Sequence, residues 1–203
     1  MTAIIDYGLG NLGSIYNMLD VIGEDSIITS DKKKIHSSDR MILPGVGSFD
    51  TGINFLKEKD LIEILNTEVK NGKPILGICL GMQLLGRRSE EGVESGLGYI
   101  PFDSVKFKFD DKINLRIPHM GWAVVNFKQK NPLIDGIEGV QRYYFVHSYH
   151  VKCDSESNVL MTCDYGYNFA ASVVKDNVYG VQFHPEKSHD FGMRLLSNFV
   201  EKC

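Results

Sequence analysis

The sequence predicts an α/β fold with a doubly wound, mostly parallel central sheet that antiparallel strands extend in the second half. In the first half, short apolar runs alternate with segments of helical spacing. In the second half, short β-rich runs are separated by turn residues. Strands joined by crossover helices indicate a parallel sheet with helices on both faces, whereas closely spaced β-rich runs indicate hairpins. With 203 residues, 43% of them hydrophobic, the chain can bury a full core, and we expect a single domain over residues 1–203.

The first half supplies the expected parallel strands and their crossover helices. The strands are expected at 3–5, 26–29, 40–43 and 74–78. Helical spacing of apolar residues predicts helices at 12–22, at 55–69 and from Met82 onward. The basic run at 32–34 is expected to be a solvated loop.

The second half supplies the expected hairpins and a final helix. Its β-rich runs are at 105–109, 123–127, 142–149, 159–163, 171–174 and 178–183. Turn pairs at 135–136 and 176–177 separate some of them. Apolar residues at helical spacing predict a last helix over 190–202.

The charge balance and the apolar segments exclude several classes of protein. The net charge is −4, from 22 basic and 26 acidic residues, which argues against a nucleic-acid binder. Asp6 interrupts the first apolar run, which lacks the basic flank of a signal peptide. The uncharged stretch at 74–86 is shorter than the roughly 20 residues of a spanning helix. We therefore expect a soluble cytoplasmic protein that binds neither nucleic acid nor a membrane.

The cysteines and histidines do not form a metal-binding pattern. The 4 cysteines include no C-x-x-C pair, so a disulfide framework and a zinc ribbon are both unexpected, and a reduced compartment is indicated. His147 and His150 lie three apart in a predicted strand and should point to opposite faces. His119 and His189 have no ligand-like spacing to a partner. We expect no metal and no other cofactor.

Gly8, Gly10 and Gly13 form a G-x-G-x-x-G sequence between a predicted strand and a predicted helix. This spacing is the dinucleotide-binding fingerprint, so one hypothesis is a nicotinamide- or flavin-binding module. A tight turn that requires glycine and a loop that meets a partner are the other interpretations. The rest of the chain carries a better-defined set of residues.

The segment Gly77-Ile78-Cys79-Leu80-Gly81 is the cysteine counterpart of the G-x-S-x-G nucleophile motif. A sharp turn from a buried strand into a helix exposes the central side chain above the sheet, and the flanking glycines leave room for that turn. The helix N-terminus also places partial positive charge near the sulfur, which favours the thiolate. Cys79 is therefore the candidate nucleophile.

A candidate base and its orienting carboxylate follow a predicted strand in His184-Pro185-Glu186. An acyl-transfer site needs an imidazole to take and return a proton, and a carboxylate to fix that imidazole. It also needs N–H donors for the oxyanion. The amide of Leu80 is one candidate donor, and the segment 44–47, which contains Gly45, Val46 and Gly47, is the other.

Six segments together show a family resemblance. They are DYGLGN at 6–11, PGVG at 44–47, GICLGMQLL at 77–85, PHMGW at 118–122, YFVHSY at 144–149 and VQFHPEKS at 181–188. With them the chain resembles the triad-type, class I glutamine amidotransferases, and more closely the glutaminase subunits of imidazole glycerol phosphate synthase. The resemblance covers nearly the whole chain.

The resemblance implies that the chain hydrolyses L-glutamine to glutamate and ammonia. It implies that Cys79 is the nucleophile, His184 the general base and then acid, and Glu186 its orienter. It implies that Gly45, Val46 and Gly47 belong to an oxyanion strand that rearranges on activation. The residues that match the substrate pocket are Gln83, Glu91, His147, Ser148 and Tyr149.

The resemblance also implies a partner and a pathway. Asn11, Trp122 and Lys187 match positions that face a (β/α)8-barrel synthase subunit, which receives ammonia in histidine biosynthesis. The segments 105–109 and 189–193 look similar to paralogues that supply ammonia to N-acetyl-sugar amidotransferases of surface-polysaccharide pathways, which is an alternative role. A cysteine peptidase or γ-glutamyl hydrolase that acts alone is a third hypothesis.

Overall fold

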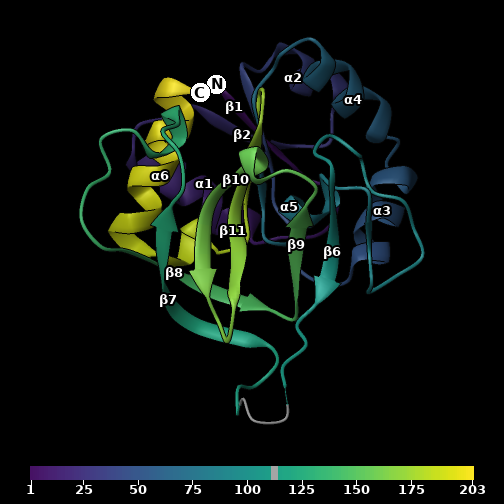
Figure 1. Ribbon diagram of the computed structural model, residues 1–203. Coiled ribbons are helices and arrows are strands. Elements are labelled where there is room, and N and C mark those ends of the chain that lie inside the picture. Colours follow the sequence, from purple (N-terminus) through teal and green to yellow (C-terminus); the bar gives the residue numbers. More distant parts are fainter. Residues whose placement is uncertain (111–113) are drawn as a thin grey trace.

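The computed structural model describes residues 1–110 and 114–203 (Figure 1). The strands are β1 Thr2–Ile5, β2 Ser26–Thr29, β3 Arg40–Leu43, β4 Ile75–Ile78, β5 Arg88–Ser89, β6 Phe102–Lys106, β7 His119–Phe127, β8 Gln141–His147, β9 Tyr149–Cys153, β10 Val159–Asp164, β11 Asn168–Lys175 and β12 Val178–Val181. The helices are α1 Leu12–Val21, α2 Lys32–Ser37, α3 Phe49–Glu58, α4 Ile62–Lys70, α5 Leu80–Leu84 and α6 His189–Lys202, with short 3₁₀ turns η1 Pro132–Ile134, η2 Glu156–Asn158 and η3 Pro185–Lys187.

The sheet has a parallel part and an antiparallel part. Its main path across the described residues runs β2-β1-β3-β4-β12-β11-β10-β7-β8. Neighbours from β2 to β12 pair in parallel. Neighbours from β12 to β8 pair antiparallel. Strand β9 joins β6 to β11 beside this path. The predicted α/β class, with a mostly parallel centre extended by antiparallel strands, is confirmed.

Alternating side chains of the parallel strands pack on two helical layers. Ile4 of β1 belongs to the core cluster that contains Leu19 of α1 and Leu196 of α6. Its neighbour Ile5 belongs to the opposite cluster, with Leu56 of α3. Figure 1 shows α1 and α6 on one side of the sheet and α2, α3 and α4 on the other. Because successive side chains of a strand point to opposite faces, one short apolar strand serves both layers.

Two expectations for the first half were wrong. The predicted helix over 55–69 is two helices, α3 and α4, which are separated at Asp60. Asp60 has φ +52°, a left-handed conformation that ends a helix, and Leu61 turns into the core after it. The basic run at 32–34 begins α2 instead of forming a loop, because the Asp31 carboxylate caps that helix by accepting a hydrogen bond from the Lys33 amide at 2.8 Å.

The predicted strand over 142–149 is also divided. It ends at His147, and β9 begins at Tyr149. Strand β8 pairs with β7, whereas β9 pairs with β6 and β11, so the chain changes neighbours at Ser148. Periodicity did not reveal this change, because both segments are rich in β-forming residues.

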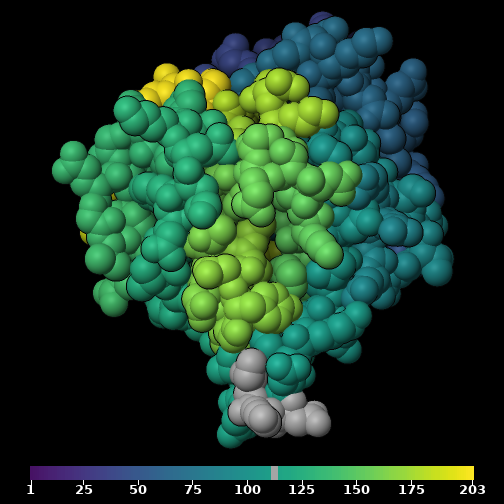
Figure 2. Space-filling model, in the orientation of Figure 1, coloured from purple at the N-terminus to yellow at the C-terminus, as the bar shows by residue number. Residues whose placement is uncertain are grey.

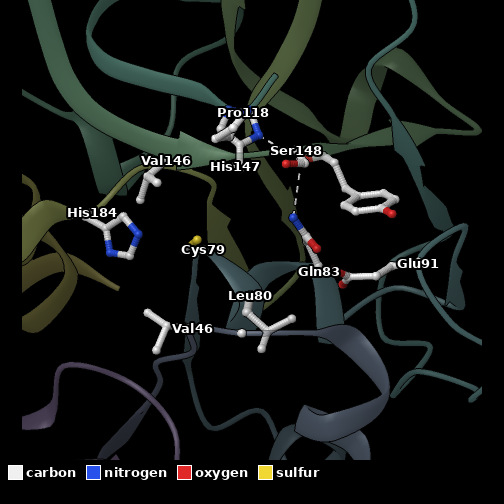
Figure 3. A pocket seen from close by; sticks show the side chains of 12 residues that line it. Val46, Cys79, Leu80, Gln83, Glu91, Pro118, Val146, His147, Ser148 and His184 are labelled. Carbon is white, nitrogen blue, oxygen red and sulfur yellow. Dashed lines mark hydrogen bonds between the residues drawn. The ribbon is translucent and has the colours of Figure 1, made fainter. Parts of the chain in front are cut away.

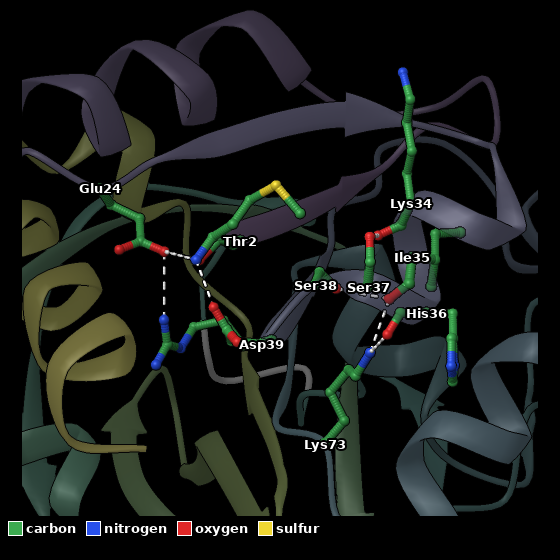
Figure 4. A network of polar contacts seen from close by, with 11 residues as sticks. Thr2, Glu24, Lys34, Ile35, His36, Ser37, Ser38, Asp39 and Lys73 are labelled. Atoms are coloured by element: carbon green, nitrogen blue, oxygen red, sulfur yellow. Dashed lines mark hydrogen bonds and ion pairs between the residues drawn. The ribbon is translucent and has the colours of Figure 1, made fainter.

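Polar contacts tie the amino-terminal ends of the parallel strands (Figure 4). The ammonium group of Met1 donates to Asp39 at 2.6 Å, which raises the pKa of that amine, and it lies 3.6 Å from Glu24. The ammonium group of Lys73 donates to the carbonyl oxygens of Ile35 at 2.8 Å and His36 at 2.7 Å, at the end of α2. These contacts hold the sheet at the edge opposite the carboxyl ends of its strands.

The antiparallel strands and their loops form most of the face seen in Figure 2. Within residues 1–110 and 114–203, no helix has both the length and the apolar character needed to cross a membrane.

Candidate active site

Three adjacent parallel strands bring the candidate catalytic segments together. In the sheet, β4 lies between β3 and β12. The segment 44–47 follows β3, Cys79 follows β4, and His184 lies shortly after β12. The carboxyl ends of neighbouring parallel strands share one edge of the sheet, which is where doubly wound proteins bind ligands.

Cys79 is on a strained turn between β4 and α5. Its φ is +54° and its ψ is −110°, which a residue with a side chain rarely adopts. A Cβ atom on Gly77 would lie 2.7 Å from the Gly81 oxygen, and one on Gly81 would overlap the Leu43 oxygen. The glycines on either side of Cys79 are therefore required by close backbone packing, as the motif predicted.

His184 and Glu186 form a buried pair. Nδ1 of His184 lies 2.8 Å from the Glu186 carboxylate, and the two side chains are 2% and 1% exposed. Burial by itself lowers the pKa of His184, but contacts with Cys79 and Glu186 outweigh it and raise this pKa to about 10. Nε2 of His184 makes no hydrogen bond with any described residue. It is therefore the nitrogen available for proton transfer with Cys79.

The segment 44–47 is packed against the turn that carries Cys79. The Tyr7 hydroxyl donates to the carbonyl oxygen of Pro44 at 2.6 Å. A Cβ atom on Gly45 would lie 2.6 Å from that hydroxyl and 2.8 Å from the Gly81 nitrogen, so only glycine fits. Val46 and Gly47 continue to the surface, and Gly47 has φ +108°.

A cavity of about 330 Å³ opens beside Cys79 (Figure 3). Most of the sequence-predicted site residues line it, namely Val46, Gly47, Cys79, Leu80, Gln83, Glu91, His147, Ser148, Tyr149 and His184. Gly45 lies behind the wall, and Glu186 lies behind His184. The lining residues Pro118 and Val146 were not predicted, although both belong to or adjoin segments that carry the family resemblance.

Two candidate substrate-binding residues, the carboxamide Gln83 and the carboxylate Glu91, lie on the opposite side of Cys79 from His184 (Figure 3). The Gln83 side chain donates through Nε2 to the Tyr149 carbonyl oxygen at 3.3 Å and to Gln182 Oε1 at 3.1 Å. The Glu91 carboxylate accepts a hydrogen bond from the Phe49 amide at 2.8 Å and is exposed at the rim. The pocket thus has the candidate nucleophile Cys79 between an imidazole and a polar end.

Gln182 was missed by the sequence analysis. Its Nε2 lies 3.7 Å from the Cys79 sulfur. The only signal was its place inside the segment 181–188, because neither periodicity nor spacing marks a buried glutamine as functional.

His119 and His147 form a cross-strand pair that spacing did not predict. Their ring nitrogens Nδ1 and Nε2 are 3.0 Å apart, and burial lowers the pKa of His119 to about 4 and that of His147 to about 3. The expectation that His147 and His150 point to opposite faces was wrong. Both rings contact Phe107, at centroid distances of 5.2 and 4.7 Å, because the strand breaks between them. No group of three or more potential metal ligands occurs among the described residues.

The predicted partner-facing residues lie near one another on elements that surround the pocket. Asn11 precedes α1, which packs against η3, the turn that contains Lys187. The ammonium group of Lys187 lies 5.9 Å from the centroid of the Tyr144 ring, which the Trp122 ring meets edge-on. Trp122 is 45% exposed on β7.

Two further apolar side chains extend this surface. Met120 and Val124 flank Trp122 at alternate positions of β7 and are 61% and 48% exposed. Alternate residues of a strand point to the same face. The spacing from Trp122 could therefore have identified Met120 and Val124 once Trp122 was known to face solvent.

The glycine-rich loop after β1 packs against the segment 44–47. Gly8 and Gly10 have φ +103° and +109°. A Cβ atom on Gly10 would lie 2.9 Å from Pro44 Cβ. The tight-turn interpretation of the G-x-G-x-x-G sequence therefore accounts for these glycines.

Comparisons with known proteins agree with this fold and site. The sequence profile of the family described as "Glutamine amidotransferase class-I" matches residues 3–203. Two solved structures, "Crystal structure of glutamine amidotransferase" and "Structure of PurLQS from Thermotoga maritima", share the fold, with TM-scores of 0.76 and 0.74 at 18% identity. They cover 98% of this chain, and this chain covers 97% and 96% of theirs. The chain belongs to the class I glutamine amidotransferase family.

Sequence relatives narrow the assignment within that family. The chain is 56% identical to "Imidazole glycerol phosphate synthase subunit HisH 2" of Methanococcus maripaludis, with 100% of both chains covered. It is 46% identical to the protein of the same name from Pseudomonas aeruginosa, with 99% of both covered. Within the family it therefore groups with the HisH subunits.

Proposed function

We propose that this chain is the glutaminase subunit of an imidazole glycerol phosphate synthase and acts in histidine biosynthesis. As one domain over residues 1–203, it hydrolyses L-glutamine and passes ammonia to a (β/α)8-barrel synthase subunit. The observation that carries the proposal is Cys79 on its strained turn, with the His184–Glu186 pair beside the same pocket. The similarity to HisH subunits over the full chain supports it.

The proposed reaction begins with attack of the Cys79 thiolate on the carboxamide carbon of glutamine. Amides of Leu80 and of the segment 44–47 stabilise the oxyanion. Ammonia then leaves with a proton from His184, and a γ-glutamyl thioester remains. Since the pKa of His184 is raised to about 10, this imidazole holds a proton at neutral pH and can act as the acid.

The second half-reaction follows from the same contacts. Cys79 contributes to the raised pKa of His184, and thioester formation removes the negative charge from its sulfur. The pKa of His184 then falls, so the imidazole can accept a proton from water. Hydroxide attack releases glutamate and restores the thiolate. Glu186 orients His184 through both stages.

The remaining pocket residues fit a glutamine substrate. We assign the exposed carboxylate of Glu91 to the α-ammonium group of glutamine, since opposite charges attract at a partly solvated rim. Gln83, His147, Ser148 and Tyr149 form the wall on the substrate side. These neutral groups hold the substrate without competing for the proton that His184 carries.

The partner surface is assigned to Asn11, Trp122 and Lys187, together with Met120 and Val124. Exposed apolar side chains grouped on one strand are typical of a protein interface. Bulk water would protonate free ammonia and remove its nucleophilicity, so transfer within a complex preserves its reactivity. We place this complex in the cytoplasm, in keeping with four free cysteines in the described chain.

The test measures glutamate release and imidazole glycerol phosphate formation by the chain mixed with its barrel subunit. Cys79→Ser should abolish both, because the nucleophile is lost. Cys163→Ser is the matched control, since Cys163 is also buried and free. Unchanged turnover of Cys79→Ser would overturn the glutaminase assignment. Glutamate release without imidazole glycerol phosphate formation would overturn the pathway.

A further inference from the structure

Gln182 occupies a buried position between the nucleophile and the substrate wall. It follows β12 directly, and its side chain is fully buried. A buried carboxamide must find partners for its N–H groups and its oxygen, because an unpaired polar group is costly in the interior. Its oxygen lies 3.1 Å from Gln83 Nε2, and its nitrogen lies 3.7 Å from the Cys79 sulfur.

A backbone carbonyl determines the direction of every hydrogen bond in this chain of contacts. The Tyr149 oxygen can only accept, so the Gln83 atom 3.3 Å from it must be the amide nitrogen. The second N–H of that nitrogen faces Gln182, which must present its oxygen there. The nitrogen of Gln182 is then the atom that faces the Cys79 sulfur. The opposite orientation of Gln182 would set two N–H donors against each other at Gln83.

The nucleophile therefore has a neutral donor on one side and an imidazole on the other. The charge that His184 offers the sulfur changes over the cycle, because this imidazole gives a proton to ammonia and later takes one from water. The N–H donor of Gln182 carries no charge to give away, and its carboxamide is buried and held through its oxygen by Gln83. Hydrogen bonds to an ionised acceptor are stronger than those to a neutral one, so this donor favours the thiolate over the thiol or thioester.

We propose that Gln182 stabilises the thiolate of Cys79 and, through its oxygen, fixes the carboxamide of Gln83 in the substrate wall. The inference rests on the proposed glutaminase role of Cys79. It assigns Gln182 two separable tasks, one on the reacting sulfur and one on a residue that positions the substrate.

Two variants separate these tasks. Gln182→Glu keeps an oxygen for Gln83 but replaces the N–H donor with a carboxyl group, which ionises before a thiol does. The thiolate must then form beside a second negative charge. Gln182→Met has a similar volume and removes both the donor and the acceptor. Gln141→Met is the matched control, because Gln141 is a buried glutamine at the far end of β8, outside the pocket.

The first measurement is alkylation of the free chain by iodoacetamide across a pH series. Mass spectrometry quantifies the peptide that contains Cys79, so the other cysteines do not contribute. Gln182→Glu should shift the midpoint of Cys79 alkylation upward by about one pH unit or more, and Gln182→Met should shift it in the same direction. Gln141→Met should match the wild-type curve.

The second measurement is glutaminase kinetics in the complex with the barrel subunit. Gln182→Glu should lower kcat by about 10- to 100-fold while KM for glutamine changes less than about twofold. Gln182→Met should lower kcat and also raise KM, because Gln83 loses its anchor. A merely structural role would change kcat without moving the alkylation midpoint.

Circular dichroism identifies variants that do not fold, and Gln182→Glu decides the test if Gln182→Met is one of them. Alkylation curves of the folded Gln182 variants that superimpose on the wild type would overturn the inference. An equal loss in Gln141→Met would also overturn it. Failure of the proposed function is distinguishable, since it would leave turnover intact in Cys79→Ser whatever the Gln182 variants do.

Discussion

The pocket has a buried histidine pair, His119 and His147, on one side and the single buried histidine His184 on another, and their protonation is opposite. Burial lowers the pKa of His147 to about 3, whereas Cys79 and Glu186 overcome burial and raise the pKa of His184 to about 10. The hydrogen-bond partners of the His147 ring are the Tyr149 carbonyl and the neutral ring of His119. Burial removes charge from an imidazole unless acidic neighbours restore it. One side of the pocket therefore holds a protonated imidazole at neutral pH, and the His147 side stays neutral.

The largest expected effect comes from removing the negative charge beside His184. Glu186→Gln leaves the size of the side chain unchanged but removes its negative charge, so His184 loses the group that orients and charges it. We expect glutaminase kcat of the complex to fall by about 100-fold or more. Glu201→Gln, an exposed change on α6, is the control. A loss below about threefold in Glu186→Gln would contradict the role of this pair.

Nuclear magnetic resonance can compare the protonation of His184 directly with that of His119 and His147. Between pH 5.5 and 8.5, the ring of His184 should remain protonated and those of His119 and His147 should remain neutral. In Cys79→Ala the pKa of His184 should drop by about one unit or more, because one of the two contacts that raise it is gone. Titration of His147 near pH 6.5 would show that its surroundings do not exclude charge.

The stability of the protein in acid tests whether folded His119 stays neutral. Below pH 6.5 an unfolded histidine gains a proton that folded His119 does not accept until the pH approaches 4, so the free energy of unfolding falls over this window. His119→Phe should reduce the loss of stability between pH 7 and 4.5 by about 1–2 kcal/mol, measured by urea denaturation. His184 acts in the opposite direction. Its contribution is complete below pH 6.5 and is lost as the pH rises through about 10. An acid-unfolding profile unchanged in His119→Phe would contradict this account.

The smallest expected effect concerns His150, a buried histidine outside the residues that line the pocket. The ring of His150 contacts the Tyr167 hydroxyl at 2.9 Å, outside the residues that line the pocket. Tyr167→Phe should cost about 1 kcal/mol of folding free energy, the usual worth of one hydrogen bond, and leave kcat unchanged. A fall in kcat would show that the contact between His150 and Tyr167 affects the reaction at Cys79.

Much of the fold followed from patterns that act over a few residues. Alternation of apolar strands with helical spacing predicted the parallel half, and the turn into α5 was predicted from the glycines around Cys79. The break at Asp60 was not predicted, because apolar spacing runs through a single left-handed residue without a change of period. The break at Ser148 was not predicted either, because the partners of β8 and β9 are distant in sequence.

The sequence by itself determined the class of fold, the candidate nucleophile Cys79, and the histidine and glutamate proposed to act with it. These depend on local requirements, namely periodicity, a tight turn and two residues on either side of a proline. Only the tertiary structure decided that Gln182, 103 positions from Cys79, points its amide nitrogen at the sulfur, and that His119 pairs with His147. The physical reason is that those contacts depend on the order of strands in the sheet. That order is set by long-range pairing, which no local pattern records.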